Sequence, residues 1–100
     1  MHRLLALYGM PTDPEQFRRH YESTHIPLGQ KIPGLKGLRW SLNVQGLGGE
    51  SPYFCIAELD FESAEAMQAG FASAEGQATA ADSPNFATGG VTVVHYDVPD

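Results

Sequence analysis

Apolar and polar positions alternate along the chain in a pattern that predicts four strands and three helical segments. Residues 2–8 are apolar on both faces and are followed by Gly9 and Pro11, which is typical of a strand buried on two sides. Period-two alternation over residues 35–45 and a dense apolar run over 53–60 predict two more strands, joined by a glycine-rich turn. In chain order we predict a strand over 2–8, a helix over 13–24, strands over 35–45 and 53–60, a helix opened by Ser63, a short helix over 73–81 and a strand over 91–98.

The first predicted helix carries signals at both of its ends. Asp13 can cap its N-terminus, Pro14 suits the first helical position, and Gln16 can close a capping box. Pro27 lacks a backbone donor, so we expect the helix to end or to kink close to it.

The order of these elements is βαββαβ. It predicts a single α+β domain over residues 1–100 with the ferredoxin-like arrangement, an antiparallel four-stranded sheet with helices on one face. The first strand, however, places Leu5 and Leu7 on one side of the sheet and Leu4, Ala6 and Tyr8 on the other. A sheet that is apolar on both faces needs a second cover. We therefore expect a homodimer in which a second copy packs sheet against sheet about a two-fold axis.

Composition narrows the classes of function. The chain has 100 residues, 42% of them hydrophobic and 18% charged, which is a globular and not a disordered composition. A formal net charge of −6 argues against nucleic acid and anionic membranes as partners. No apolar run is long enough to cross a bilayer and no secretory signal is visible, so we expect a cytoplasmic protein. The single cysteine, Cys55, lies in an apolar run and is expected to be a small buried hydrophobe.

Two short motifs point to a known family. They are Thr24-His25-Ile26-Pro27-Leu28, at the end of an aromatic-rich first helix, and Lys31-Ile32-Pro33-Gly34-Leu35, just before the second strand. With them, and with the stretches over residues 58–63 and 81–86, nearly the whole chain resembles the EthD family of the dimeric α+β barrel superfamily. That family takes its name from a protein in an ethyl tert-butyl ether degradation cluster.

The resemblance implies a dimer whose two sheets close into a barrel, and a small-molecule pocket between the sheet and the helices of each subunit. Some family members look like dehydratases or decarboxylases of aromatic polyketides. Superfamily neighbours include polyketide cyclases, muconolactone isomerase-like proteins, cofactor-free monooxygenases and haem-binding enzymes. The fold alone does not choose among these activities.

His25 is the strongest candidate for chemistry. Phe17, Tyr21 and His25 share the helical face that points toward the sheet. An imidazole in an apolar pocket can act as general acid or base near neutral pH, because its ordinary pKa is about 6.5. His25 can equally bond a backbone carbonyl and fix the turn before Pro27. Tyr21, one turn earlier, can hold a substrate oxygen or can be core packing with a satisfied hydroxyl.

Three further residues are candidate ligand contacts, each with a structural alternative. Phe17 shares the face of His25, Trp40 suits either a pocket wall or the core, and His95 lies in the last strand. His95 can face the pocket, the barrel interior or a dimer contact. His20 lies off the apolar face beside two arginines and is expected to be solvated.

We expect neither a metal nor a cofactor. His20 and His25 are five residues apart, so on a regular helix they do not share a face and do not form a zinc pair. His25 or His95 could serve as an axial haem ligand, but no other feature of the sequence indicates haem binding. The sequence therefore favours a small cofactor-free enzyme that cyclises, dehydrates or isomerises an aromatic or polyketide-like carbonyl compound. The alternatives are a non-catalytic accessory protein that binds a hydrophobic metabolite, and a cofactor-free monooxygenase.

Overall fold

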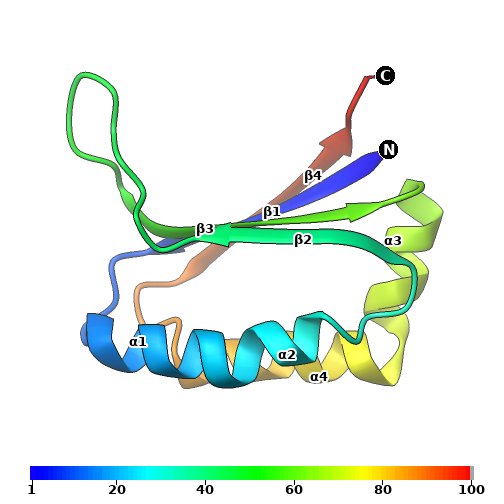
Figure 1. The fold of residues 1–100 in the computed structure, drawn as a ribbon, viewed down its shortest axis with the longest axis horizontal. Coiled ribbons are helices and arrows are strands. Elements are labelled where there is room, and N and C mark those ends of the chain that lie inside the picture. Colours follow the sequence, from blue (N-terminus) through cyan, green and yellow to red (C-terminus); the bar gives the residue numbers. More distant parts are fainter. Residues whose placement is uncertain (100) are drawn as a thin grey trace.

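The computed structural model describes residues 1–99 as one antiparallel sheet with all helices on one of its faces (Figure 1). The strands lie in the order β2-β3-β1-β4, and every neighbouring pair is antiparallel. This is the predicted ferredoxin-like α+β fold. The elements in chain order are β1 (His2–Gly9), α1 (Pro14–His20), a π-helical turn (Tyr21–His25), α2 (Ile26–Gly29), β2 (Leu35–Ser41), β3 (Tyr53–Phe61), α3 (Ala64–Ala72), α4 (Ala74–Asp82), a 3₁₀ turn (Ser83–Asn85) and β4 (Val91–Asp97).

The helix starts follow the sequence signals, with one difference at α1. Asp13 caps α1 by accepting a hydrogen bond from the backbone N–H of Gln16 at 3.1 Å, and Ser63 caps α3 in the same way. The Gln16 side chain does not close a capping box; it donates to the backbone oxygen of Asn85 at 3.1 Å. This bond ties the start of α1 to the 3₁₀ turn that follows α4. The second strand ends at Ser41 and not at Gln45.

The first helical segment continues beyond its predicted end. After α1 the backbone passes through the π-helical turn, where the N–H of Ile26 bonds the carbonyl of Tyr21 five residues back. Pro27 then occupies the first turn of α2, where a missing N–H leaves no bond unmade. Of the two alternatives predicted at Pro27, the helix does not end there, because the wider turn restarts it just before the proline. Gly34 makes the turn into β2 with a φ of 83°.

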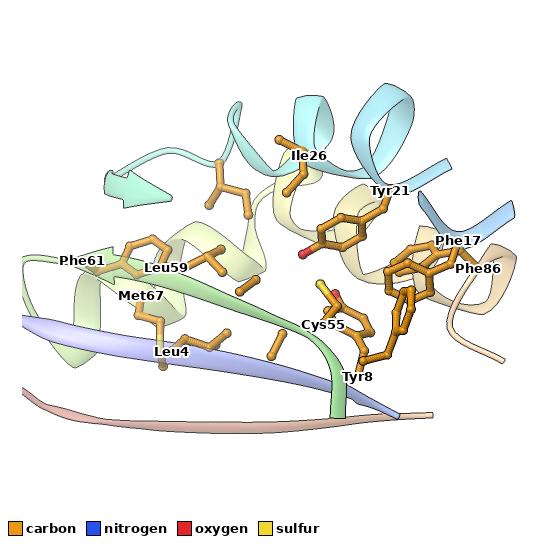
Figure 2. Packing of buried hydrophobic residues seen from close by; sticks show 14 residues of the cluster. Leu4, Tyr8, Phe17, Tyr21, Ile26, Cys55, Leu59, Phe61, Met67 and Phe86 are labelled. Atoms are coloured by element: carbon orange, nitrogen blue, oxygen red, sulfur yellow. The ribbon is translucent and has the colours of Figure 1, made fainter. Parts of the chain in front are cut away.

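The core lies between the sheet and the helices (Figure 2). Alternate residues of β1 and β3 point into it, and aromatic side chains from α1, the π-helical turn and the segment before β4 cover them. Cys55 is fully buried in this core, as predicted, and burial raises the pKa of its thiol to about 12. The fully buried side chains are Tyr21, Phe17, Phe61, Phe86 and Cys55.

The opposite face of the sheet carries no helix in Figure 1. Leu5, Leu7 and Ile56 project onto it and are only partly buried. Around them, Arg3 binds Asp60 at 2.7 Å, and Arg39 binds Glu58 across the β2–β3 pair at 3.1 Å. The loop between β2 and β3 also stands out on this side (Figure 1).

The helices of the structure are short. No helix within residues 1–99 is long and apolar enough to cross a membrane.

Candidate functional site

A cavity of about 680 Å³ lies between the helix-covered face of the sheet and the α3–α4 pair. Its walls are mostly apolar side chains of β1, β3, β4 and α3. The polar groups that line it include the His25 imidazole and the Tyr8 hydroxyl, with Gln68, Thr79 and Ser83 from the helices. The volume is in the range that proteins use for small organic ligands. The apolar wall residues include Leu4, Ala6, Leu59, Met67, Phe71 and Val93.

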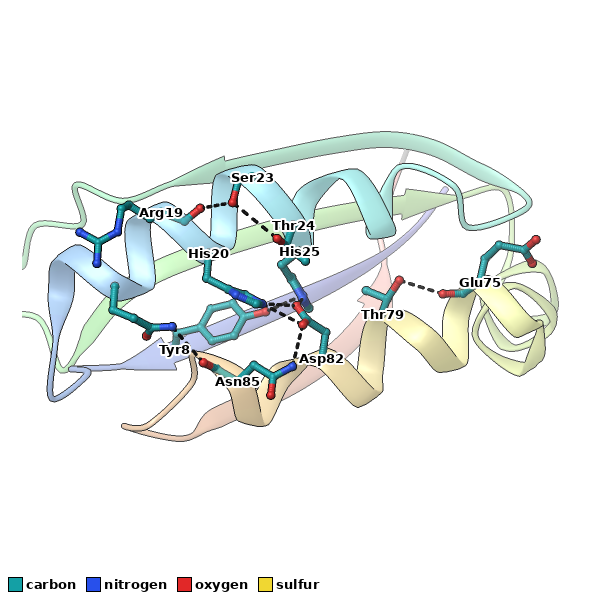
Figure 3. A network of polar contacts seen from close by, with 11 residues as sticks. Tyr8, Arg19, His20, Ser23, Thr24, His25, Glu75, Thr79, Asp82 and Asn85 are labelled. Atoms are coloured by element: carbon teal, nitrogen blue, oxygen red, sulfur yellow. Dashed lines mark hydrogen bonds and ion pairs between the residues drawn. The ribbon is translucent and has the colours of Figure 1, made fainter.

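His25 lines this cavity from the end of the π-helical turn and is paired with a carboxylate (Figure 3). Its Nδ1 lies 2.9 Å from Oδ2 of Asp82, the last residue of α4. Because an ionised carboxylate can only accept, the Nδ1 of His25 carries the proton and its Nε2 has the acceptor lone pair of the ring. That Nε2 lies 3.5 Å from the Tyr8 hydroxyl. The pair thus presents a proton acceptor beside a phenol at the cavity wall.

The same carboxylate has two further partners. The Nε2 of His20 lies 2.8 Å from Oδ1 and 3.0 Å from Oδ2 of Asp82, and the amide of Asn85 donates to Oδ1 at 2.9 Å. We refer to His20, His25, Asp82 and Asn85 together as the Asp82 cluster. Both carboxylate oxygens are therefore bonded on either side, which fixes the plane of the group and the direction of its bond to His25.

The electrostatics of the cluster favour an ionised aspartate beside a neutral imidazole. Burial lowers the pKa of His25 below its ordinary value, and the attraction of Asp82 offsets this only in part. For Asp82, burial acts to raise the pKa, but the hydrogen bonds from Asn85, His20 and His25 outweigh it and leave the pKa below its usual value. Burial also raises the pKa of Tyr8, so its phenol stays protonated and can donate.

Aromatic rings hold the imidazoles in place. Phe86 packs against the His25 ring at a centroid distance of 4.6 Å and stacks on the His20 ring at 5.5 Å. Tyr21 stacks on the His25 ring at 5.4 Å and forms edge contacts with Tyr8 and with Phe86, each at 5.4 Å. Two aromatic rings therefore pack against the imidazole of His25, and its orientation does not depend on hydrogen bonds alone.

The candidate residues from the sequence lie in different places. His25 lines the cavity, whereas Tyr21 and Phe17 are fully buried in the core and are absent from the described lining. Trp40 is 37% exposed and lines a separate hollow at the β2 edge. His95 lies on β4 outside the described lining and approaches His2. The structure therefore brings Tyr21 to the His25 ring and leaves Trp40 and His95 away from it.

Sequence reasoning missed three of the four members of the Asp82 cluster, namely Asp82, His20 and Asn85. Asp82 lies just beyond the short helix predicted over 73–81, and its position 57 residues from His25 gives no local signal. His20 was expected to be solvated, but it is only partly exposed and bonds Asp82. The expectation that His20 and His25 lie on different faces was wrong because the π-helical turn between them places residues five apart one above the other.

A second cluster of the same residue types lies at the edge of the sheet, and we call it the Asp97 cluster. The Nδ1 of His2 donates to Oδ1 of Asp97 at 2.6 Å, and its Nε2 lies 2.8 Å from Nδ1 of His95. Among residues 1–99, no group of three His, Cys, Asp or Glu side chains is arranged to hold a metal ion.

Comparisons with known proteins give a consistent picture. The family model described as EthD domain matches residues 10–90. An uncharacterized 11.0 kDa protein in the thcB–thcC intergenic region of Rhodococcus erythropolis is 48% identical over 99 residues, covering 97% of this chain and 94% of that protein. The crystal structure of an ethyl tert-butyl ether degradation (EthD) family protein from Bacillus halodurans has a TM-score of 0.92 at 33% identity, covering 99% of both chains.

More distant structures share the fold alone. A hydroxynitrile lyase from Passiflora edulis has a TM-score of 0.78 at 14% identity, covering 99% of this chain and 94% of that one. A dimeric ferredoxin-like protein from Thermobifida fusca has a TM-score of 0.75 at 16% identity, covering 97% and 90%. The fold therefore includes both an enzyme and a protein described as a dimer.

Proposed function

Since this chain belongs to the EthD domain family, we propose that it is a small cofactor-free enzyme that moves a proton within a hydrophobic carbonyl compound bound in the cavity. One observation carries the proposal: a neutral His25, oriented by Asp82, lines an apolar cavity beside the Tyr8 phenol. A base of this kind needs no cofactor to remove a proton next to a carbonyl.

The proposed chemistry uses three side chains. The Nε2 of His25 takes a proton from the carbon next to the ligand carbonyl, and the electron pair of that C–H bond moves onto the carbonyl oxygen. The Tyr8 hydroxyl donates to the enolate oxygen that forms, and Asp82 stabilises the imidazolium. Return of the proton to another carbon completes an isomerisation. In a ring closure the enolate carbon attacks a second carbonyl of the ligand, and the proton goes to the alkoxide that forms. In a loss of water the proton goes to a hydroxyl two carbons from the carbonyl, which leaves as water as its C–O bond breaks. In this scheme Tyr21 supports the ring of the base and does not touch the ligand.

The cavity walls indicate an uncharged ligand. Among the described lining residues there is no lysine and no arginine, and the lining residue His25 is bonded to the Asp82 carboxylate. A carboxylate or phosphate on the ligand would meet no positive partner there and would lose its hydration. We therefore propose a neutral aromatic or polyketide-like carbonyl compound as the ligand.

The apolar walls also favour a second candidate function. A non-catalytic protein that carries a hydrophobic metabolite would need the same cavity, but it would not need a proton acceptor inside it. The two candidates differ only in the role of His25, so the test must separate ligand binding from proton removal.

The sharpest test measures exchange of ligand protons with solvent. The probe is 2-tetralone, a neutral aromatic ketone, incubated in deuterated buffer while NMR follows the loss of its protons next to the carbonyl. We expect the protein to accelerate exchange and His25→Gln to reduce the acceleration about 10²- to 10⁴-fold. Asp97→Asn, which alters the other histidine–carboxylate pair, should leave exchange unchanged.

Binding of the ketone is measured in parallel by calorimetry. Binding without accelerated exchange in the wild type supports the carrier function. Exchange that survives His25→Gln contradicts the enzyme proposal.

We further propose that the open face of the sheet packs against a second copy. Leu5, Leu7 and Ile56 form an apolar centre there, and the Arg3–Asp60 and Arg39–Glu58 pairs lie around it. Light scattering is expected to give twice the 10.8 kDa chain mass, and Leu7→Lys to halve the measured mass. Ala78→Lys on the exposed surface of α4 is the control. A wild-type monomer at micromolar concentration would overturn this assignment.

A further inference from the structure

The Asp82 carboxylate is shared by two imidazoles (Figure 3): that of His25, which lines the cavity, and that of His20, which lines a separate hollow. We propose that His20 is a positioning residue that competes with His25 for the single negative charge of Asp82, and so keeps His25 in its uncharged, proton-accepting form. This role of His20 regulates the site described above, and its benefit to the protein rests on the proposed function. Its observations and its test require no ligand.

The geometry supports sharing and not simple pairing. His20 approaches both oxygens of Asp82, at 2.8 and 3.0 Å, while His25 reaches Oδ2 at 2.9 Å. The amide of Asn85 completes the set of donors at 2.9 Å. One carboxylate can balance one positive charge, so protonation of either imidazole leaves the other next to an ion pair with no net charge.

The positive charge is better placed on His20 than on His25. The His20 side chain is 23% exposed, and it borders a shallow hollow on the outer side of α1 with Gln16, Arg19 and Ser23. The His25 side chain is 9% exposed and is enclosed by aromatic rings. A charge costs less free energy where water can reach it. A proton bound by the cluster is therefore held at His20, and His25 keeps its lone pair.

The groups around the two rings do not reverse this preference. On the His25 side, Tyr8 from β1 and Tyr21 from the π-helical turn are both protonated, because burial raises the pKa of each phenol. On the His20 side, Arg19 is exposed to solvent, which screens its charge. Charge on His20 also adds to burial in lowering the pKa of His25.

The π-helical turn is what makes the sharing possible. On a regular α-helix, residues five apart are turned about 140° from each other, so two histidines at this spacing cannot reach one carboxylate. The turn Tyr21–His25 closes bonds over five residues and aligns His20 with His25. Turns of this kind are costly and are frequent at functional sites. The turn therefore has a role in the Asp82 cluster besides restarting the helix before Pro27.

The test is an NMR titration of the His25 imidazole in the ligand-free protein. In the wild type at mildly acidic pH, nitrogen shifts are expected to show the doubly protonated ring at His20 and the neutral ring, protonated at Nδ1, at His25. His20→Gln keeps a donor toward Asp82 but cannot take up a proton. The titration midpoint of His25 is therefore expected to shift upward, because Asp82 then balances charge on His25 alone.

Two further variants distinguish the effect of a positive charge at position 20 from the effect of changing the side chain there. His20→Lys supplies a permanent positive charge at the same place, so the midpoint of His25 is expected to stay below that of His20→Gln. Asp97→Asn should leave the midpoint at its wild-type value. A midpoint that is unchanged in folded His20→Gln overturns the proposal, and so does a wild type in which His25 is charged before His20. The wild-type spectra decide the matter if a variant fails to fold.

Failure of this inference is distinguishable from failure of the proposed function. Accelerated ketone exchange with an unshifted His25 midpoint contradicts the role of His20 alone. A shifted midpoint with no exchange in any variant contradicts the enzyme and leaves the sharing of charge in place.

Discussion

The Asp82 cluster and the Asp97 cluster each contain one aspartate and two histidines, yet their hydrogen bonds are arranged differently. In the Asp82 cluster the carboxylate lies between the two imidazoles, and its side chain is 8% exposed. In the Asp97 cluster an imidazole, that of His2, lies in the middle, and the Asp97 side chain is 88% exposed. The first cluster joins α1, the π-helical turn, α4 and the 3₁₀ turn, whereas the second joins only the neighbouring strands β1 and β4.

The difference teaches that residue type and distance do not by themselves make a functional site. The 2.6 Å contact of Asp97 is shorter than any contact of Asp82, but water surrounds its carboxylate and screens the attraction. The Asp82 carboxylate acts across a protein interior, where the same charge has a larger effect on its neighbours. Burial of the carboxylate, and not the length of the bond, sets the influence of each cluster on its histidines.

The largest expected effect comes from removing the ring that packs on both imidazoles of the Asp82 cluster. Phe86→Ala is expected to lower the free energy of unfolding by about 3–5 kcal/mol, because it opens a cavity in a fully buried aromatic core. The Asp97 cluster has no such ring in the described contacts beyond its own histidines. Urea unfolding measures the loss, and the His25 titration in the same variant should broaden. A loss of less than about 1 kcal/mol would contradict the packing role of Phe86.

Asp82→Ala is expected to cost about 3 kcal/mol of unfolding free energy, since it leaves two imidazoles and an amide without their common acceptor. Asp97→Ala is the matched variant, and its effect should be much smaller because the exposed carboxylate is replaced by water. Both are measured by urea unfolding at pH 7. Equal losses in the two variants would show that burial does not separate the clusters.

The two clusters also show what the sequence can and cannot predict. The period-two pattern, the caps at Asp13 and Ser63 and the apolar first strand predicted the sheet and its helices, because these signals are local. His25 was identified from its helical face. Its partner was not, because the bond to Asp82 joins segments 57 residues apart and no pattern of one segment encodes it.

The placement of His20 failed for a different physical reason. A helical wheel assumes 3.6 residues per turn, and the π-helical turn breaks that period between His20 and His25. Pro27 marked a disturbance of the helix in the right place, but a missing donor does not tell whether the chain stops, kinks or widens its turn. The placement of His20 relative to His25 therefore depended on the assumption of a regular α-helical period.

A smaller effect is expected from acid. Because burial lowers the pKa of folded His25 below the unfolded value of 6.5, the unfolded state binds more protons as the pH falls below 6.5. Stability is then lost between pH 6.5 and the lower pKa of the folded state. For Asp97 the hydrogen bond from His2 lowers the pKa, so its contribution is lost only below its unfolded value of 3.8.

Urea unfolding at pH 7.5, 5.5 and 4.5 measures the loss that His25 causes apart from that of Asp97, because all three pH values lie above 3.8. His25→Gln is expected to flatten the decline between pH 6.5 and 4.5, whereas Asp97→Ala should leave the decline as it is in the wild type. If the wild type, His25→Gln and Asp97→Ala all lose the same stability between pH 6.5 and 4.5, His25 is not the source of the loss.

The smallest expected effect is at Tyr8, and it distinguishes a structural hydroxyl from one that serves a ligand. The Tyr8 oxygen lies 3.5 Å from Nε2 of His25, which is at the limit of a hydrogen bond, whereas the bonds to Asp82 are 2.8 to 3.0 Å. Tyr8→Phe should therefore change the free energy of unfolding by about 0.5 kcal/mol or less. It should nevertheless slow ketone proton exchange, because the enolate oxygen loses its donor. A large loss of stability with unchanged exchange would contradict this prediction. It would show that the Tyr8 hydroxyl stabilises the fold and that His25 transfers the proton without help from Tyr8.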